Sequence, residues 1–449
     1  MKKYALEWEY LLSPKRLGSA SHVPKSPERS QFQRDYDRII FSSPFRRLQN
    51  KTQVFPLPGS IFVHNRLTHS LEVASVGRSL GNFLAVELEK NGQAAGDDFF
   101  SSFGAIVSAA CLAHDLGNPP FGHSGEKAIS RYFSDGNGKA LQKMVSHDEW
   151  LDLTHFEGNA NAFRVLTHRF QGRRNGGFAL TYATLASLVK YPYGSAAAGE
   201  KHKYGFFASE KAIFSEIAAE QRLRCLSGAG VYSRHPLVYL VEAADDITYQ
   251  IMDVEDAHKL KILSYDETYH ILTSFWEAAS EEGKAFFSYT DEIFKTVTDR
   301  NERISYLRAT LINKLVTECI DLFIRHYEAI MNGCFDRSLM DALEGISAAG
   351  MENCRKLSGK RIYNHPSVVE VEIAGYRILG ALLDDFVDAA LFPQSPYAQK
   401  LLLLLPEQFR SQPDDPVYTQ IQSVLDFVSG MTDLFALDLY RTIHGMKQG

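Results

Sequence analysis

Residues 111–126, CLAHDLGNPPFGHSGE, place ionisable side chains on both sides of a Pro-Pro turn. An apolar helical run reaches His114 and Asp115, and we expect it to end there because Gly117 and the following prolines cannot continue it. An imidazole and a carboxylate in a last helical turn could bind one Mn, Fe, Ni, Zn or hydrated Mg ion. The alternative is a histidine that stabilises a helix C-terminus beside a capping aspartate.

A second histidine and a glutamate follow the turn. His123 precedes a predicted helix, and Glu126 lies three residues later, within hydrogen-bonding reach. A histidine held by a carboxylate is the arrangement that general acid or base catalysis needs. The alternative is a glutamate that only stabilises the helix dipole.

A third histidine lies in residues 64–80, HNRLTHSLEVASVGRSL. His69 falls on the apolar side of the predicted helix, where a lone histidine is usually a packed core residue. Arg66 precedes it by three residues, on the same side if the helix extends back that far. A cation beside such a histidine is unusual for packing and typical of a phosphate site.

An acidic stripe runs along the helix predicted at 236–259. Glu242, Asp245, Tyr249 and Asp253 follow one another at i, i+3, i+7 and i+11, while apolar residues occupy much of the rest. The stripe is either the solvated side of this helix or, together with the His-Asp pair, the wall of a site.

The elements that must position these residues are mainly helical, because the apolar positions recur at helical spacing and alternating β-branched runs are scarce. Only 52–63 and 203–207 could pair as strands. Residues 13–30 resemble an extended arm, and 192–203 and 393–416 resemble loops. The predicted helices are 68–90, 101–116, 124–133, 157–170, 208–223, 236–259, 303–331 and 365–391.

Composition narrows the class of protein. The 449 residues carry a net charge of −6, which argues against a surface coated with basic residues for nucleic acid. Five cysteines without a CxxC pair argue against a disulfide framework and a thiolate zinc site. The N-terminal MKKYALEWEYLL lacks the apolar core of a signal peptide, and the aliphatic run 401–405 is too short to span a bilayer. We therefore expect a cytoplasmic protein that does not enter a membrane.

The order His69, His114-Asp115, Asp245 is the pattern of the HD-domain metal-dependent phosphohydrolases. Six blocks in order resemble, more narrowly, the deoxyguanosine triphosphate triphosphohydrolase family, and GKRIYNHPSVVEVEIAGYRIL (359–379) resembles its C-terminal helical region more loosely. The six blocks are FQRDYDRIIFSSPFRRLQNKTQVF (32–55), RLTHSLEVASVGRSL (66–80), HDLGNPPFGHSGE (114–126), HFEGNANAFRVL (155–166), KYPY (190–193) and YLVEAADDITYQIMD (239–253).

The resemblance implies an all-α HD fold with minor β hairpins, divided into an N-terminal arm and entry segment (1–60), a catalytic core (61–260) and a C-terminal helical region (261–449). It implies hydrolysis of dGTP, or of all four dNTPs, at the α-phosphorus to a deoxynucleoside and tripolyphosphate. It also implies a divalent ion, with Mn²⁺ or Mg²⁺ ahead of Fe, Ni, Co or Zn. A homo-oligomer, hexamer or tetramer, is expected, with an allosteric dNTP or single-stranded DNA as candidate regulators.

The resemblance also assigns residue roles. Asp245 is preferred to Asp246 as a ligand because it shares a helix face with Tyr249 and Asp253. The implied metal ligands are His69, His114, Asp115 and Asp245. The implied catalytic pair is His123, as the proton-transfer group, with Glu126 orienting it. The implied substrate-binding residues are Gln53, Arg66, Asn159, Lys190, Tyr191, Tyr249 and Asp253.

Two rival hypotheses remain open at this stage. One is another HD phosphohydrolase, acting on cyclic dinucleotides, guanosine tetraphosphate or a nucleoside monophosphate, although the signature HHExxDGxGYP of one such group is absent. The other is a nucleotide- or DNA-sensing protein whose metal site only supports structure. A lost catalytic histidine or glutamate would favour the sensor, and neither is lost in this chain.

Overall fold

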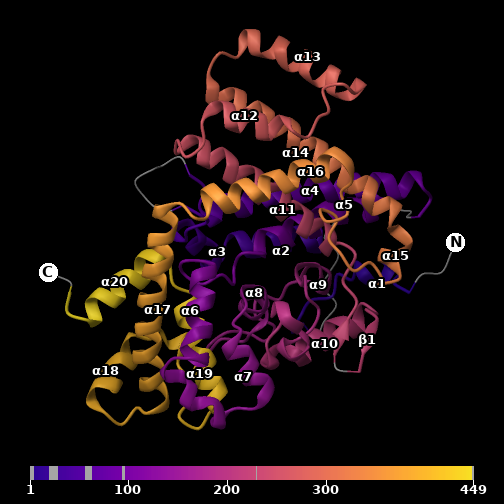
Figure 1. The fold of residues 1–449 in the computed structure, drawn as a ribbon. Helices are drawn as coiled ribbons and strands as arrows, with labels where there is room; N and C mark the ends of the chain where they lie inside the picture. Colours follow the sequence, from indigo (N-terminus) through magenta and orange to yellow (C-terminus); the bar gives the residue numbers. More distant parts are fainter. Residues whose placement is uncertain (1–4, 20–28, 56–62, 94–96, 229, 447–449) are drawn as a thin grey trace.

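The computed structural model describes residues 5–19, 29–55, 63–93, 97–228 and 230–446, and the fold is all-α. Two helices at its centre, α4 (Arg66–Lys90) and α5 (Asp97–Ala113), pack along each other, with α2 (Gln31–Ile40) against α5 and α11 (Val238–Lys259) against both (Figure 1). The close approach needs a glycine, since a Cβ at Gly81 would lie 2.8 Å from the backbone of Gly104. This helical pair and α11 supply most of the candidate site.

A second group of helices forms its own apolar core beside the first. In Figure 1, α17 (Pro366–Leu391) runs alongside α6 (His123–Ser134), and α19 (Val417–Ser429) packs on α17. The core between them is lined by buried side chains that include Phe133, Leu379 and Phe427. Helices from the C-terminal part of the chain therefore pack on α6 and fix its position. The first turn of α6 carries His123 and Glu126.

The eight predicted helices are all present, with shifted ends. The predicted helix 101–116 begins at Asp97 and ends at Ala113, and 303–331 is two helices that meet at His326. The remaining α-helices are α1 (Trp8–Leu11), α3 (Ser43–Arg47), α7 (His147–Thr154), α8 (Gly158–Thr167), α9 (Tyr182–Leu188), α10 (Lys211–Glu220), α12 (Tyr265–Thr273), α13 (Glu281–Thr296), α14 (Arg300–Arg325), α15 (Tyr327–Met331), α16 (Gly345–Leu357), α18 (Pro396–Leu404) and α20 (Asp433–Ile443). Short 3-10 turns are η1 (Leu48–Asn50), η2 (Asn137–Met144), η3 (Ser195–Ala197), η4 (Gly199–Lys201), η5 (Ala208–Glu210) and η7 (Glu407–Phe409), and η6 (Ser358–Ile362) is a π-helix.

The strand predicted at 203–207 is wrong, and most of the one predicted at 52–63 lies outside the described residues. Within the described residues the one hairpin pairs β1 (Cys225–Ser227) with β2 (Val231–Tyr232). Residues 203–207 form a connection whose aromatic side chains are buried in the core, so their hydrophobicity reflects packing rather than strand pairing. Thr52 makes only an isolated bridge to Asn65, and residues 56–62 lie outside the described part.

The loop predicted at 393–416 contains a helix, α18. Ser395 accepts a hydrogen bond from the backbone of Ala398, and Pro396 occupies the first turn, so this segment carries its own helix start. In the predicted arm, Arg16 forms an isolated bridge to Thr181 and donates to the buried Asp35 at 2.6 Å, while residues 20–28 lie outside the described part. No helix in the described ranges combines the length and apolarity needed to cross a membrane.

Asp152, in α7, gives a stability prediction. Its Oδ2 accepts hydrogen bonds from the Ala208 backbone and the Tyr418 hydroxyl, at 2.7 Å each, and burial raises its pKa to about 7. Because the folded-state pKa lies above the unfolded value of 3.8, the stability that Asp152 contributes at low pH is lost as pH rises through about 7. We expect Asp152→Asn to gain melting temperature relative to the parent between about pH 5 and pH 8. Thermal unfolding followed by circular dichroism at both pH values tests this, and a pH-independent difference would contradict it.

Candidate metal and catalytic site

The first turn of α4 aims two side chains inward. Asn65 caps the helix by accepting from the backbone of Thr68 at 2.9 Å, and the Thr68 hydroxyl accepts from the Asn65 backbone at 3.1 Å. This reciprocal cap fixes the first turn, which carries Arg66 and His69. Both side chains are buried, three residues apart on one face, as the sequence predicted.

The His-Asp pair lies just beyond α5 rather than inside its last turn. The helix ends at Ala113, and His114 Nδ1 donates to the carbonyl of Cys111 at 2.6 Å. That bond leaves Nε2 as the nitrogen that faces the site. A Cβ at Gly117 would lie 2.1 Å from the backbone of α8, so only glycine lets this turn pack so closely.

The acidic stripe of α11 faces the interior of the fold and is not a solvated surface. Glu242 and Asp253 are buried, and Asp245 and Tyr249 are partly buried. Asp245 Oδ1 lies 3.1 Å from His69 Nε2 and 3.4 Å from His114 Nε2. The stripe therefore meets the two histidines across the centre of the fold.

All four predicted metal ligands come together where α11 meets the two histidines. One ligand atom each from His69, His114 and Asp115 lies within 4.8 Å of the others, and Asp245 reaches both imidazoles. The distance from His114 Nε2 to Asp115 Oδ1 is 3.5 Å. His114 Nε2 is buried and makes no hydrogen bond to any described residue, although two carboxylates face it. A buried lone pair between two carboxylates is where a cation would be stabilised.

The charges around His114 agree with that interpretation. Burial alone would lower the pKa of His114, but the Asp115 and Asp245 carboxylates raise it to about 9. Burial would likewise raise the pKa of Asp245, and the two imidazoles hold it well below its usual range. Two imidazoles and two carboxylates form a mixed nitrogen and oxygen donor set that fits a catalytic divalent ion. The residues present therefore fit such an ion, whose element they leave open.

His123 and Glu126 form a hydrogen-bonded pair on the first turn of α6. His123 Nδ1 lies 2.9 Å from Glu126 Oε2, and Glu126 Oε1 accepts from the backbone of Gly158 at 2.9 Å. The hydrogen bond to Glu126 raises the pKa of His123. The histidine side chain is 72 % exposed, so its Nε2 is open to a substrate.

Arg66 connects the pair to the ligand cluster. Its Nη1 donates to Asp115 Oδ2 at 2.8 Å, and its Nη2 lies where a Cβ at Gly122, the residue before His123, would come within 2.6 Å. Burial would raise the pKa of Asp115, but Arg66 and then His114 keep it below its usual range. The arginine expected at phosphate therefore also holds a predicted metal ligand.

Lys190 lies beside α11, and Asn159 lies in the first turn of α8. Lys190 Nζ lies 2.9 Å from Glu242 Oε1 and 5.7 Å from the centre of the Tyr191 ring. The Asn159 side chain donates to Glu157 Oε1 at 2.5 Å. Lys190 and Asn159 are thus held by acidic partners rather than left free in solvent.

A polar corner lies further along α11. Asp253 Oδ2 accepts from the hydroxyl of Tyr363 at 2.8 Å, and the rings of Tyr249 and Tyr363 stack with centroids 6.2 Å apart. Burial raises the pKa of Asp253 to about 8. Gln53 is half-buried, and its Oε1 has no hydrogen-bond partner among the described residues.

Sequence reasoning missed three residues near the predicted set: two contact its members, and the third pairs with Glu157, the partner of Asn159. Asn118 donates through Nδ2 to Asp115 Oδ1, Tyr363 reaches Asp253, and Lys203 forms an ion pair with Glu157 at 2.6 Å. Asn118 could have been found, since it follows Asp115 by three residues in the same turn. Tyr363 and Lys203 stand in segments with no periodic signal for the site.

Comparison of the sequence with known proteins places this chain in a family. The profile of the HD domain matches residues 66–164, and that of the phosphohydrolase-associated domain matches residues 346–442. A deoxyguanosinetriphosphate triphosphohydrolase-like protein of Synechocystis sp. is 39% identical over 98% of this chain and 100% of its own length. One of Pseudomonas aeruginosa is 36% identical over 98% and 99%. A deoxyguanosinetriphosphate triphosphohydrolase of Yersinia pseudotuberculosis is 31% identical over 92% and 93%. The chain therefore belongs to the deoxyguanosinetriphosphate triphosphohydrolase family of HD-domain phosphohydrolases.

Proposed function

We propose that this chain is a metal-dependent deoxynucleoside triphosphate triphosphohydrolase. Water adds to the α-phosphorus of dGTP, or of all four dNTPs, the bond from phosphorus to O5′ breaks, and O5′ gains a proton. The products are a deoxynucleoside and tripolyphosphate. The observation that carries the proposal is the meeting of two histidines and two carboxylates around His114 Nε2, which has no hydrogen-bond partner among the described residues. Arg66 extends from this cluster to Gly122, the residue before His123.

The metal ligands in this proposal are His69, His114, Asp115 and Asp245. When bound there, a divalent ion would polarise the α-phosphoryl group and lower the pKa of a water molecule. Asn118 and Arg66 hold the two oxygens of Asp115 and so fix its orientation. The Cys111 carbonyl fixes the tautomer of His114 in the same way.

His123 carries the proton transfer. Its Nδ1 is occupied by Glu126, which leaves Nε2 to exchange a proton with the attacking water or with the leaving O5′. Glu126 is itself held by the Gly158 backbone, so it orients the imidazole and stabilises its protonated form. These contacts are those of a proton-transfer group with an orienting carboxylate.

The triphosphate needs cations and donors. We assign Lys190, Tyr191 and Arg66 to it, since Lys190 acts as a point charge and Arg66 can make directional contacts. Lys203 adds a further cation close to His123. The hydrogen bond to Glu126 raises the pKa of His123, and the charge of Lys203 lowers it by a smaller amount. Lys190 would exchange its contact with Glu242 for phosphate oxygens.

The sugar and base contacts follow from the corner of α11. Asp253 and the ring of Tyr249 are assigned to deoxyribose, with Tyr363 holding Asp253 in place. A carboxylate that accepts the 3′-hydroxyl beside a ring packed where a 2′-hydroxyl would lie selects against ribonucleotides. Gln53, with its unpaired oxygen, and Asn159 are assigned to the base or the phosphates.

The finer properties complete the proposal. Mn²⁺ or Mg²⁺ is the proposed ion, and the chain is proposed to act in the cytoplasm as a homo-oligomer, with a dNTP or single-stranded DNA as a candidate regulator. The proposed division is an entry segment (1–60), a catalytic core (61–260) and a region for the pocket wall and subunit contacts (261–449). The two matched profiles, at 66–164 and 346–442, support a core followed by an associated helical region.

Product analysis tests the function. Purified protein is incubated with Mn²⁺ and each dNTP or GTP, and the products are separated by ion-exchange chromatography. Deoxynucleoside with tripolyphosphate, faster from dNTPs than from GTP, is the expected result. A nucleoside monophosphate with pyrophosphate would contradict it and favour another phosphohydrolase, and no turnover with any nucleotide mixture would favour the sensor.

Replacing Glu126 tests the role of the dyad. In Glu126→Gln the amide can still accept from Gly158 but has no charge, so the pKa of His123 should fall. We expect the titration in kcat that depends on His123 to move to lower pH, and kcat to drop by roughly 10²–10⁴-fold. The control is Glu89→Gln, an exposed residue in the last turn of α4. An unchanged pH profile of kcat in Glu126→Gln would show that Glu126 does not act through His123.

A further inference from the structure

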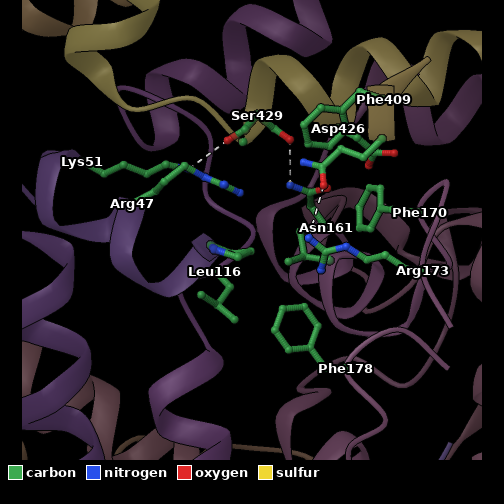
Figure 2. A pocket seen from close by; sticks show the side chains of 14 residues that line it. Arg47, Lys51, Leu116, Asn161, Phe170, Arg173, Phe178, Phe409, Asp426 and Ser429 are labelled. Atoms are coloured by element: carbon green, nitrogen blue, oxygen red, sulfur yellow. Dashed lines mark hydrogen bonds between the residues drawn. The ribbon is translucent and has the colours of Figure 1, made fainter. Parts of the chain in front are cut away.

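A small cavity lies between α3, α8 and α19, and its lining includes Leu116, the residue after the predicted ligand Asp115 (Figure 2). Its volume is about 30 Å³. Figure 2 shows Arg47 and Lys51 entering from one side and Arg173 from the other. The rings of Phe170 and Phe178 line the remaining wall. None of these residues has a role in the proposed hydrolysis.

The three cations around this cavity are poorly neutralised. Arg47 makes no hydrogen bond or ion pair with any described residue, and its guanidinium lies against Gly430. Arg173 donates only to the amide oxygen of Gln408, at 3.2 Å, and forms no ion pair in the described part of the chain. Burial and then the nearby charge of Arg173 lower the pKa of Arg47, which shows that the two guanidinium groups are close enough to repel.

Lys51 is the most buried of the three. Its Nζ donates to the carbonyls of Asn118 at 2.6 Å and Ser429 at 2.8 Å, which leaves one of its three N–H donors. Neutral carbonyls do not cancel its charge. Burial and then the charge of Arg47 lower the pKa of Lys51 to about 7, and the opposing charges of Asp433 and Asp115 do not restore it to its usual value.

The one carboxylate among the described lining residues does not neutralise these cations. Asp426 accepts from Arg164 through both oxygens, at 2.8 Å each, so its charge is already paired. The cavity therefore carries an excess of positive charge beside aromatic walls, where a low dielectric strengthens electrostatic attraction. Core packing alone does not account for three cations that face one small space.

We propose that this cavity binds a small tetrahedral oxyanion of the phosphate type, held by Arg47 and Arg173 with Lys51 at its base. A space of about 30 Å³ holds roughly two water molecules, so it suits one tetrahedral group and excludes a whole nucleotide. The exposed Arg173 forms the outer wall and can admit the ion by moving its side chain. Guanidinium groups are suited to bidentate contact with phosphate oxygens.

The site is separate from the metal ligands but is linked to them through Asn118. Lys51 holds the carbonyl of Asn118, whose side chain holds Asp115. The proposal needs no catalytic step, so it can be tested on protein without substrate or metal. Its failure would leave the proposed hydrolysis untouched.

Isothermal titration calorimetry with inorganic phosphate, on the full chain at constant ionic strength, tests the site. Arg47→Gln and Arg173→Gln are each expected to weaken phosphate binding by roughly tenfold or more, because each removes a charged donor. The control is Arg46→Gln, which removes the same charge from the neighbouring, exposed residue and should bind as the parent does. Circular dichroism confirms that each variant is folded, and Arg173 stands on an exposed loop where substitution is tolerated.

A fourth variant separates this cavity from the catalytic site. Lys190→Gln removes a cation proposed to bind the substrate triphosphate, and phosphate binding in the cavity should not change. Tripolyphosphate should bind in the cavity no more tightly than phosphate, because the space encloses one tetrahedral group. The proposal is wrong if millimolar phosphate gives no saturable binding, if Arg47→Gln and Arg173→Gln bind as the parent does, or if Lys190→Gln alone abolishes binding.

Discussion

Asp245→Asn is expected to remove both metal binding and hydrolysis. Its Oδ1 is the carboxylate oxygen that approaches both His69 and His114, at 3.1 and 3.4 Å. An amide removes the negative charge from the site without changing its shape. Loss of a residue that only orients a metal ligand lowers metal affinity about 10–100-fold. Because Asp245 is itself a proposed ligand, we expect Asp245→Asn to lower the affinity for Mn²⁺ by about 100-fold or more. Equilibrium dialysis against Mn²⁺ and the product assay measure the two effects.

The neighbouring carboxylate provides the control. Asp246→Asn makes the same chemical change one residue along α11, where the side chain points away from the two imidazoles by about 100°. We expect it to bind Mn²⁺ as the parent does. Retention of Mn²⁺ by Asp245→Asn, or its loss in Asp246→Asn alone, would show that the ligand has been assigned to the wrong carboxylate.

Arg164→Met should lower the free energy of unfolding more than any other substitution named above. The guanidinium is buried, pairs with both oxygens of Asp426, and donates to Glu210 at 2.7 Å. Methionine fills much of the same volume but leaves two buried carboxylates without a cation. Breaking a buried ion pair in this way costs about 3–5 kcal/mol of unfolding free energy. Urea denaturation followed by circular dichroism measures the loss.

An exposed ion pair gives the comparison. Arg355 Nη2 lies 3.5 Å from Asp341 Oδ1, with both side chains in solvent, so Arg355→Met should change stability by less than about 1 kcal/mol. Equal effects of the two substitutions would contradict the view that Arg164 joins α8 of the HD domain to α19 of the associated domain. Partial recovery of stability in the double variant Arg164→Met/Asp426→Leu would support it, because one unpaired carboxylate is then removed.

The helices and the ligand cluster could be predicted because their signals are local. Apolar residues at helical spacing located α4, α5 and α11 to within a few residues, and the glycine and prolines after Asp115 indicated the turn that follows it. The stripe on α11 could be recognised from spacing alone, although only the structure shows that Glu242 and Asp253 are buried. Local patterns therefore indicated where the site lies.

Contacts between distant segments could not be predicted. Tyr363 reaches Asp253 across 110 residues, and Arg164 reaches Asp426 across 262, with no periodic pattern to link either pair. The predicted strand at 203–207 failed for a related reason, because a short apolar run reads alike whether it pairs in a sheet or packs as a buried connection. The pairing of Arg66 with Asp115 was missed because an arginine near a predicted metal site was interpreted as a ligand for substrate phosphate rather than as a partner of a metal ligand.

Hydrolysis in ¹⁸O-labelled water tests the central claim, which is attack of water at the α-phosphorus, most directly. The protein is given Mn²⁺ and dGTP, and mass spectrometry locates the label in the products. We predict that the label appears in tripolyphosphate and not in the deoxynucleoside, since the bond between phosphorus and O5′ breaks. Label in the deoxynucleoside, or in a monophosphate or orthophosphate product, would contradict the account.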